Sequence, residues 1–508
     1  MKPSLIVNLL QNVGIPLSRL SVCLLVAALL MTPLFLAQSA RAAGTGIKVG
    51  KNVDIRGETA PDKQIMEPAL AVDPRDPSIV VASAEDHNTI PVGGCFSSDR
   101  CHSWGAYSRS TDGGVTWITR LLPGFPGDTS PEGLSSPLQN FAVVGHTSVA
   151  FDRSGNVYYS MFVCNATASG GFDGKSFRIA VAKFANDGRD YVGTAIVSGG
   201  GDGDSVLPRI AVDATGGPFD SNIYVTFINV DNAGNTEFFT RSSDGGATFS
   251  KPIPMPGSGL AVAPVVDPAG NVFVESVHCF KGGPPCGGGT PASILVTKST
   301  DGGLSFGPPV VIAQITADPA EFPGNNFGPE FLTGVSWHLA SDTAGVYVVW
   351  DDFGTGNADV LFSKSTDGGL TWTSPIRVND VAQGEQFLPG IAVSGGIISV
   401  AWYDSRLGQL PNGTITNLDV FYAESTDGGA TFSKSIRVTS SSFDPNLVNW
   451  GEKDPSSAFS PFLGDRLGLA ASPAGVLAAW TDNRNACDTI DATFGCVDQD
   501  VLVAKISP

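Results

Sequence analysis

The sequence predicts an all-β fold, a single β-propeller of four-stranded antiparallel blades, and three observations predict it. The first is an eight-residue turn motif that occurs five times. The second is a pair of strand-like segments, here called the A–B unit, that recurs seven times. The third is a composition of 61 Gly and 35 Pro among 508 residues, which is typical of many short strands joined by turns. Repeats of this kind indicate one large domain built from small units.

The repeated motif reads S-[ST]-D-G-G-x-[ST]-[WF]. An Asp side chain can accept hydrogen bonds from the N–H groups of its own turn, and glycine adopts the positive φ angles that such turns need. The closing Trp or Phe can anchor the turn by packing between strands. A weaker copy occurs at Asp187-Gly188. We therefore expect the motif aspartates to form turns and to take no part in catalysis: Asp112, Asp244, Asp301, Asp367 and Asp427.

The segments between the motifs define four strands per blade. In the last complete copy, strands A to D are expected at residues 390–394, 396–406, 418–425 and 435–438. A seventh strand C at 500–507 ends before any strand D, and segment 47–55 resembles strand D. We expect this N-terminal segment to complete the last blade, because closure removes an unpaired edge. Seven blades are predicted, with six as the alternative if one degenerate unit is not a full blade.

The N-terminus has the features of an export signal. An apolar run at 21–37 follows basic residues and precedes a small-residue cleavage-like site. The alternative is an uncleaved membrane anchor, but the run is short and contains Pro33. We expect residues 1–43 to be a signal peptide and residues 44–508 to form the propeller, in a secreted or periplasmic protein with no membrane insertion after signal cleavage.

Cysteine usage agrees with export. Six cysteines fall into close pairs that would each close a short loop, as disulfides do in an oxidising compartment. Free thiols are the alternative, and the spacings do not match a zinc site. The predicted disulfides are Cys95–Cys101, Cys279–Cys286 and Cys487–Cys496.

Charge limits the partners. Lys and Arg number 30 against 49 Asp and Glu, a net charge of −19. Such a surface repels nucleic acid and anionic lipid, so we expect neither as a partner. A glycan or an extracellular protein is expected instead, bound by a monomer. No metal site or cofactor is predicted, since Ca²⁺ would suit the acidic surface but no specific motif supports it.

The five motifs resemble the Asp boxes, or BNR repeats, of the sialidase superfamily, over about residues 100 to 435. The resemblance implies an Asp-box β-propeller whose active face lies opposite the boxes. A sialidase needs three substrate-binding arginines, a Tyr/Glu nucleophile pair and an acid/base Asp, usually with an Arg-Ile-Pro-like segment before the first box. That segment is absent here, and the nearest strings, at 177–180 and 208–211, follow the first box. Sialidases are also six-bladed, so no catalytic residue is carried over.

The predicted site therefore comes from the loops. A–B turns are short, whereas the B–C and D–A loops are long, and all three cysteine pairs fall in B–C loops. Binding sites are expected on such a face. Strand B often ends in an aromatic residue followed by an acid. The candidate catalytic residues are the acids Asp404 and Asp482, with Tyr403 as a nucleophile by analogy with sialidases.

The same strand ends supply candidate substrate-binding residues, which are Arg406, Arg484, Trp402 and Trp480. In the alternative interpretation, each Asp only braces its own loop by pairing with Arg406 or Arg484. Further acids and a cation in the long D–A loops are candidates to join the same polar ring: Glu321, Glu330, Glu385 and Asp465-Arg466.

Two functional hypotheses follow from these patterns. The first is a glycan-active, sialidase-type exo-glycosidase, which predicts carboxylates and arginines that converge in one central pocket. The second is a non-catalytic extracellular propeller that binds a glycan or a protein, which predicts a flat or apolar loop face.

Overall fold

The computed structural model describes most of the chain after the predicted signal segment. The described ranges are 46–57, 65–86, 103–165, 177–197, 204–231, 234–255, 264–279, 291–316, 321–323, 330–332, 337–447, 463–485, 490–491, 495–496 and 499–507. The chain divides into Met1–Thr45, which lies outside the described residues, and Gly46–Pro508. In the ranges given above, no helix combines the length and the apolar character needed to cross a membrane.

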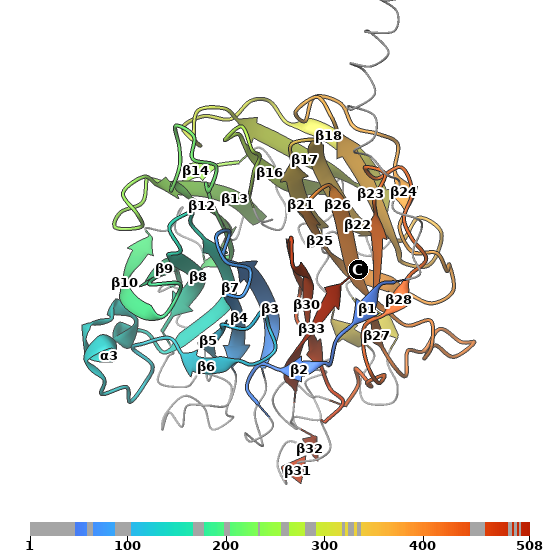
Figure 1. Ribbon diagram of the computed structural model, residues 1–508, viewed down its shortest axis with the longest axis horizontal. Coiled ribbons are helices and arrows are strands. Elements are labelled where there is room, and N and C mark those ends of the chain that lie inside the picture. Colours follow the sequence, from blue (N-terminus) through green and yellow to red (C-terminus); the bar gives the residue numbers. More distant parts are fainter. Residues whose placement is uncertain are drawn as a thin grey trace, which may run out of the picture. The chain divides into compact units, whose positions relative to one another are not determined.

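Seven antiparallel sheets form the blades of the Gly46–Pro508 unit (Figure 1). Blade 1 contains β3 (Ile65–Val72), β4 (Val80–Asp86), β5 (Trp104–Ser110) and β6 (Ile118–Leu121). Blade 2 contains β7 (Val143–Phe151), β8 (Val157–Cys164), β9 (Arg178–Ala185) and β10 (Asp190–Val197). Blade 3 contains β11 (Asp204–Val212), β12 (Ile223–Asp231), β13 (Gly234–Ser242) and β14 (Ile253–Pro254). Blade 4 contains β15 (Val265–Val266), β16 (Val272–Cys279), β17 (Pro291–Ser299) and β18 (Val310–Thr316).

The remaining blades follow the same order. Blade 5 contains β21 (Trp337–Asp342), β22 (Gly345–Asp352), β23 (Asp359–Ser365) and β24 (Ile376–Arg377). Blade 6 contains β25 (Gln386–Ser394), β26 (Ile397–Asp404), β27 (Asp419–Ser425) and β28 (Ile436–Arg437). Blade 7 contains β29 (Gly468–Ser472), β30 (Gly475–Asp482) and β33 (Asp500–Ser507), with β1 (Lys48–Val49) and β2 (Val53–Asp54). The connections carry the hairpins β19 (Glu321–Pro323)–β20 (Glu330–Leu332) and β31 (Ile490–Asp491)–β32 (Gly495–Cys496), the helix α3 (Pro131–Ser135) and the 3₁₀ helix η2 (Pro137–Asn140).

The propeller is closed by its two ends. Both β1 and β2 pair antiparallel with the C-terminal β33, with Lys48 opposite Ser507 and Val53 opposite Val503. The innermost strands contact one another in sequence from β3 through β29 and back to β3. The predicted seven-bladed propeller, closed by an N-terminal strand, is therefore confirmed.

The five repeated motifs form the same turn. In the first, Asp112 Oδ1 accepts from the backbone N–H groups of Val115 and Thr116 at 3.0 and 2.9 Å. Ser110 Oγ donates to the same carboxylate at 2.8 Å and accepts from the Gly114 N–H at 2.9 Å. Gly113 and Gly114 have φ angles of 74° and 90°, which favour glycine. Asp244, Asp301, Asp367 and Asp427 make equivalent contacts, so these aspartates form turns as expected.

Four of the five turns, those of Asp244, Asp301, Asp367 and Asp427, also join their blade to the preceding one. Phe306 packs edge-on against Phe239 of blade 3, with ring centroids 4.8 Å apart. Arg241 NH1 of blade 3 donates to the Gly302 carbonyl in the same turn at 3.1 Å. Lys183, Lys298 and Lys364 reach the next blade's turn in the same way. Thus one short motif supplies a turn, an aromatic contact and an acceptor for a cation between blades.

The weak copy at Asp187-Gly188 is a different turn. Asn186 and Asp187 have φ angles of 53° and 59°, which make a tight hairpin between β9 and β10. Asn and Asp tolerate this left-handed conformation better than most residues. The interpretation of this segment as a motif copy is therefore wrong. The outer strand that it opens, β10, has eight residues and β18 of blade 4 has seven, whereas β14, β24 and β28 have two each.

Candidate functional site

Strand A of several blades begins with a bulge at the loop end of the blade. In blades 1, 2, 3 and 6 the register with strand B shifts at this point. One residue of each bulge has a positive φ angle: Glu67 at 56°, His146 at 46°, Leu207 at 53° and Leu388 at 49°. Such angles are costly for residues other than glycine and are often found at functional sites.

The equivalent position in blade 7 holds Arg466. Gly468 pairs with Ala479 in blade 7 as Gly390 pairs with Ala401 in blade 6, so Arg466 corresponds to Leu388. Three successive blades, 7, 1 and 2, therefore place Arg466, Glu67 and His146 at one position of the inner strand. Blades 3 and 6 place leucine there. The polar residues thus gather on one arc of the centre.

These residues form a compact cluster of charges, here called the central cluster: Glu67, Glu85, His146, Arg209, Asp465 and Arg466. Arg466 donates to Glu67 Oε2 at 2.9 Å and to Asp465 Oδ1 at 2.8 Å. His146 Nδ1 lies 3.2 Å from Glu67 Oε2 and 3.8 Å from Asp465 Oδ2. Arg209 NH2 lies 3.5 Å from the same Asp465 oxygen.

Burial divides the central cluster into a supporting side and an accessible side. The side chains of Glu67 and Arg466 are 1% and 3% exposed. Those of His146 and Asp465 are 27% and 16% exposed. Glu85 supports the bulge from β4, since it accepts a hydrogen bond from the His146 N–H. A ligand can therefore contact His146 and Asp465 while Glu67, Glu85 and Arg466 hold them in place.

The neighbouring charges shift the pKa values in the central cluster. Burial opposes protonation of His146, but Glu67, Glu85 and Asp465 raise its pKa to about 9. Burial acts to raise the pKa of Asp465, yet the charges of Arg466, Arg209 and His146 hold it below its ordinary value. Burial and repulsion from Asp465 and Glu85 raise the pKa of Glu67. At neutral pH the accessible side therefore presents an imidazolium beside a carboxylate.

The charges of the central cluster also act on a histidine of a fifth blade. His338 lies on β21 of blade 5. Burial, followed by the charges of Arg209 and Arg466, lowers the pKa of His338 to about 3. His338 is therefore neutral at physiological pH, in contrast to His146.

Part of the central cluster matches a metal-ligand set. The ligand atoms of Glu67, Glu85 and His146 lie within 4.8 Å of one another. A histidine nitrogen with two carboxylates suits Zn²⁺ or Mn²⁺ better than Ca²⁺. However, Arg466 already donates to the Glu67 oxygen that faces His146. The arginine supplies the positive charge that a metal would bring, so the central cluster is balanced by its own residues.

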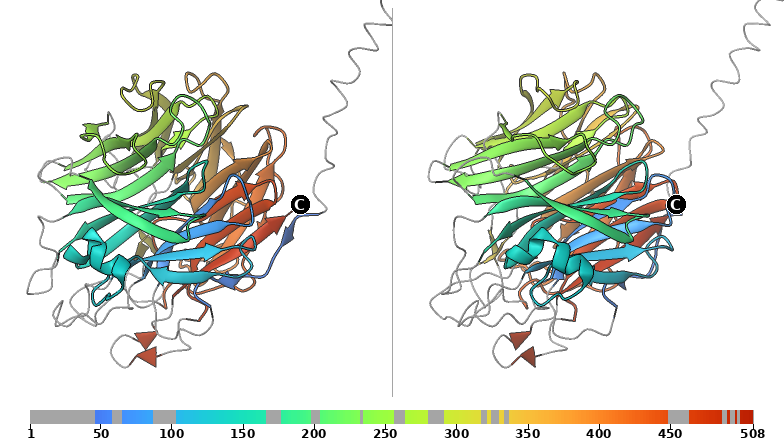
Figure 2. Two further views of the ribbon diagram at one scale, coloured as in Figure 1. Left: turned by 60° about the vertical axis from the view of Figure 1, so that its left-hand side comes forward. Right: turned by 90° about the vertical axis from the view of Figure 1, so that its left-hand side faces the viewer.

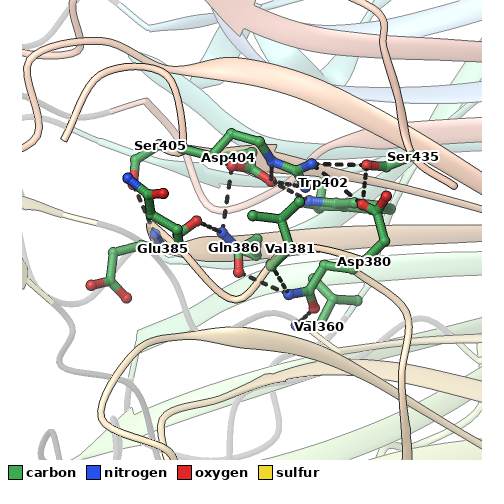
Figure 3. Close-up of polar contacts among 12 residues, drawn as sticks. Val360, Asp380, Val381, Glu385, Gln386, Trp402, Asp404, Ser405 and Ser435 are labelled. Carbon is green, nitrogen blue, oxygen red and sulfur yellow. Dashed lines mark hydrogen bonds and ion pairs between the residues drawn. The ribbon is translucent and has the colours of Figure 1, made fainter.

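The residues predicted as catalytic from the sequence occupy a different place. Asp404 is fully buried at the end of β26 and accepts from Trp402 Nε1 at 2.9 Å and Arg406 NH2 at 2.6 Å. Figure 3 shows the Asp404 carboxylate enclosed by these contacts and by Gln386. Arg406 NH1 also contacts Ser435 at 2.9 Å and Asp380 at 3.3 Å. Arg406 thereby ties blade 6 to the connection that leaves blade 5.

Blade 7 repeats this arrangement. Asp482 is fully buried and accepts from Trp480 Nε1 at 2.8 Å and Arg484 NH2 at 2.7 Å. Arg484 NH1 donates to Ser440, in the connection that leaves blade 6, at 2.7 Å. These contacts favour the bracing interpretation of both Asp–Arg pairs. Catalytic and substrate-binding roles for these residues stay predictions.

Tyr403 is buried in the core of blade 6 and accepts from the Thr481 N–H at 2.9 Å. Thr481 Oγ1 in turn accepts from the Glu67 N–H at 3.3 Å. Burial raises the pKa of the Tyr403 hydroxyl above its ordinary value. Tyr403 therefore supports the central cluster through Thr481. Its hydroxyl lies against Thr481 and not on the accessible side, where a nucleophile would have to act.

The other predicted residues lie partly inside and partly outside the central cluster. Asp465 and Arg466 belong to the central cluster. Glu385 lies apart, where it accepts from the Ala358 N–H at 2.6 Å. The side chains of Glu321 and Glu330 lie outside the described residues. So do those of the predicted disulfides, Cys95–Cys101, Cys279–Cys286 and Cys487–Cys496, whose pairing stays a prediction.

Sequence reasoning missed Glu67, Glu85 and His146 as site residues. Glu67 and His146 share no motif, because each blade contributes a different residue type at the same position. An alignment of the strand A segments could have found Glu67 and His146, but not Glu85, which lies on β4: IMEPALAV, VGHTSVAF, SVLPRIAV and QFLPGIAV. The third residue is polar in blades 1 and 2 and leucine in blades 3 and 6.

Comparisons with known proteins find similarity to solved structures only. No protein-family model and no curated protein sequence matches it. A solved structure of a protein of unknown function from Dyadobacter fermentans has a TM-score of 0.45 at 14% identity, over 91% of this chain and all of that one. A Hadza microbial sialidase has a TM-score of 0.41 at 14% identity, over 89% and 68%. An α-L-arabinofuranosidase from Fusarium graminearum has a TM-score of 0.41 at 13% identity, over 77% and 98%.

Proposed function

We propose that this chain is an exported glycoside hydrolase whose active centre is the central cluster, on the loop face of an Asp-box propeller. The observation that carries the proposal is the pairing of His146 with Asp465. Their side chains are partly exposed, His146 Nδ1 lies 3.8 Å from Asp465 Oδ2, and the nearby charges keep one protonated and the other ionised. Because Glu67 and Asp465 both face Nδ1, the proton donor to a substrate would be Nε2. Glycoside hydrolysis needs such a pair, a proton donor and a carboxylate at one bond.

Each residue then has a distinct role. His146 protonates the leaving oxygen, because its pKa of about 9 keeps it charged at neutral pH. Asp465 serves as the carboxylate that attacks the sugar or activates water. Glu67 orients the imidazole through Nδ1, as a carboxylate does in a catalytic triad. Arg209 lies beside Asp465 and can hold an anionic group of the substrate.

This proposal keeps the sequence-based expectation of a sialidase-like enzyme but moves the site. Asp404 and Asp482 are each fully buried and bound by an arginine of their own loop. Asp465 combines a free face with a position at the centre of the propeller. The export signal and the three disulfides remain part of the proposal, since an acidic propeller of this kind suits an extracytoplasmic compartment.

A panel of aryl glycosides, including a sialoside and an arabinofuranoside, tests the proposal with the mature chain. We expect release from at least one substrate, and a fall in kcat/KM of about 100-fold or more in Asp465→Asn. Lys434→Ala, which removes an exposed cation of blade 6, is the control and should keep full activity. Hydrolysis that persists in Asp465→Asn would remove the central cluster as the active centre. Glycan binding without any release would favour the non-catalytic alternative.

A further inference from the structure

Blade 2 departs from the repeat where its outer edge meets blade 1. Its C–D turn is a tight hairpin, and its outer strand β10 has eight residues. Among the described connections, the one that enters this blade is the one with helices, α3 and η2. Tyr191 of β10 donates to Ser136 in that connection at 3.0 Å. Figure 2 shows α3 against this edge of the propeller. A local departure from a repeat suggests a local function.

The departure encloses a cavity of about 690 Å³. Strands β5 and β6 of blade 1 form one wall, the α3 connection forms the second and the β9–β10 hairpin forms the third. This volume lies in the range of sites that bind small ligands. The cavity is separate from the central cluster, none of whose residues line it.

The floor of the cavity is aromatic and held in place. Tyr107 and Phe184 stack with centroids 4.3 Å apart and planes 2° from parallel. Tyr191 meets Phe184 edge-on at 5.6 Å. The Tyr107 hydroxyl donates to the Gly188 carbonyl at 2.7 Å, which ties the two blades together. Beside this floor, the Ile118 side chain is 65% exposed and gives the cavity an apolar surface.

Two arginines of blade 1 offer the cavity positive charge. Tyr107 lies opposite Arg120, and Arg109 lies opposite Ile118, so the register places both arginines on the cavity side of β5 and β6. The Arg109 Nε donates to the neutral Asp187 carbonyl at 2.7 Å. The charge of Arg109 also acts on Asp190, whose pKa is lowered first by Arg189 and also by Arg109. Arg189, by contrast, is paired with Asp190 at 2.8 Å. On a chain of net charge −19, this pair of arginines is a local exception.

Carboxylates complete the lining. Asp128, Glu132 of α3 and Asp190 of β10 line the same space as Arg109 and Arg120. Asp128 accepts from the Gly124 and Ser130 N–H groups of its own loop. A ligand that suits all these groups carries an anionic group for the arginines, neutral hydroxyl donors for the carboxylates and an apolar ring face for Ile118. We infer that this cavity binds an acidic saccharide, a sugar unit with a carboxylate or a sulfate. The site would hold an acidic glycan on the enzyme at a distance from the central cluster.

Isothermal titration calorimetry with the mature chain tests this inference. The probes are a galacturonate trisaccharide, a sulfated disaccharide and a neutral cello-oligosaccharide. We expect binding of a carboxylated or a sulfated probe and none of the neutral one, and the two acidic probes show which anionic group is preferred. Arg120→Ala should weaken binding about tenfold or more, while Arg120→Lys should keep part of it. Lys434→Ala is the matched control, with unchanged affinity expected. Salt should weaken binding because Arg120 is exposed.

Equal affinity for acidic and neutral probes, or unchanged affinity in Arg120→Ala, would overturn the inference, and so would no binding at all. Arg120 is exposed, so its loss should leave folding intact, which thermal unfolding checks. Asp465→Asn separates this site from the active centre, because it should abolish hydrolysis and leave binding to this cavity unchanged.

Discussion

The Arg466 guanidinium donates to the Glu67 carboxylate at 2.9 Å, and this pair joins the last blade to the first at the centre of the propeller. The side chains are 3% and 1% exposed. At the outer edge, β1 pairs with β33 and closes the same two ends of the chain by backbone hydrogen bonds. The ring is therefore closed twice, and the inner closure also builds the proposed active centre.

Breaking the inner closure should be costly. Arg466→Met leaves the buried Glu67 and the partly exposed Asp465 without their shared partner, and we expect the free energy of unfolding to fall by about 3–5 kcal/mol. Urea unfolding measures this change. The double variant Glu67→Gln/Arg466→Met should recover part of the loss. Arg189→Met, which breaks a pair on a side chain that is 65% exposed, should leave the free energy of unfolding nearly unchanged. Equal losses of unfolding free energy in Arg466→Met and Arg189→Met would contradict a stabilising role of the Arg466–Glu67 pair.

Stability should depend on pH through His146. Its pKa in the folded protein, about 9, lies above the ordinary value of 6.5. Protonation of His146 therefore stabilises the fold fully below pH 6.5, and this contribution is lost as pH rises through 9. We expect the free energy of unfolding to fall by up to about 3 kcal/mol over this window. His146→Gln should lack this decline. If the free energy of unfolding changes with pH in the same way in the wild type and in His146→Gln, the raised pKa of His146 is contradicted.

The Asp–Arg braces should support stability without catalysis. Arg484→Met leaves Asp482 fully buried without its guanidinium, so we expect a loss of about 3 kcal/mol in unfolding free energy. Because the contacts of Arg484 lie within the brace, kcat/KM at 25 °C should stay within about twofold of the wild type. A large fall in kcat/KM with unchanged stability would restore the sequence-based prediction of Arg484 as a substrate-binding residue.

The repeated turns should each contribute modestly. Asp301→Ala removes acceptors for the N–H groups of Leu304 and Ser305 and for the Ser305 hydroxyl. We expect a loss of about 1–2 kcal/mol, similar to the loss of a helix N-cap, which thermal unfolding would reveal. Glu132→Ala removes a carboxylate in the first turn of α3 and serves as the control, with little change expected. No difference between the two variants would show that the turn aspartate is dispensable.

The sequence predicted most of the fold because its signals are local. Asp301 and its glycines specify a turn within eight residues, and the unmatched strand at 500–507 predicted closure by 47–55. The brace was one of two interpretations of Asp404 and Arg406, and only the hydrogen bonds distinguish them. Asp465 and Arg466 were predicted as site residues, but their contact with Glu67 and His146 was not, because these residues meet through the geometry of three blades. The spacing of these residues along the chain does not show that they are in contact.

The most direct test of the active centre compares leaving groups. Wild type, His146→Gln and Asp465→Asn are assayed on two glycosides of the same sugar, one with a poor leaving group and one with a good one. If His146 is the proton donor, His146→Gln should lose about 100-fold or more on the poor leaving group and little on the good one, since the latter needs no protonation. Asp465→Asn should lose activity on both. Equal losses of His146→Gln on the two substrates, or full activity in Asp465→Asn, would contradict the proposed centre.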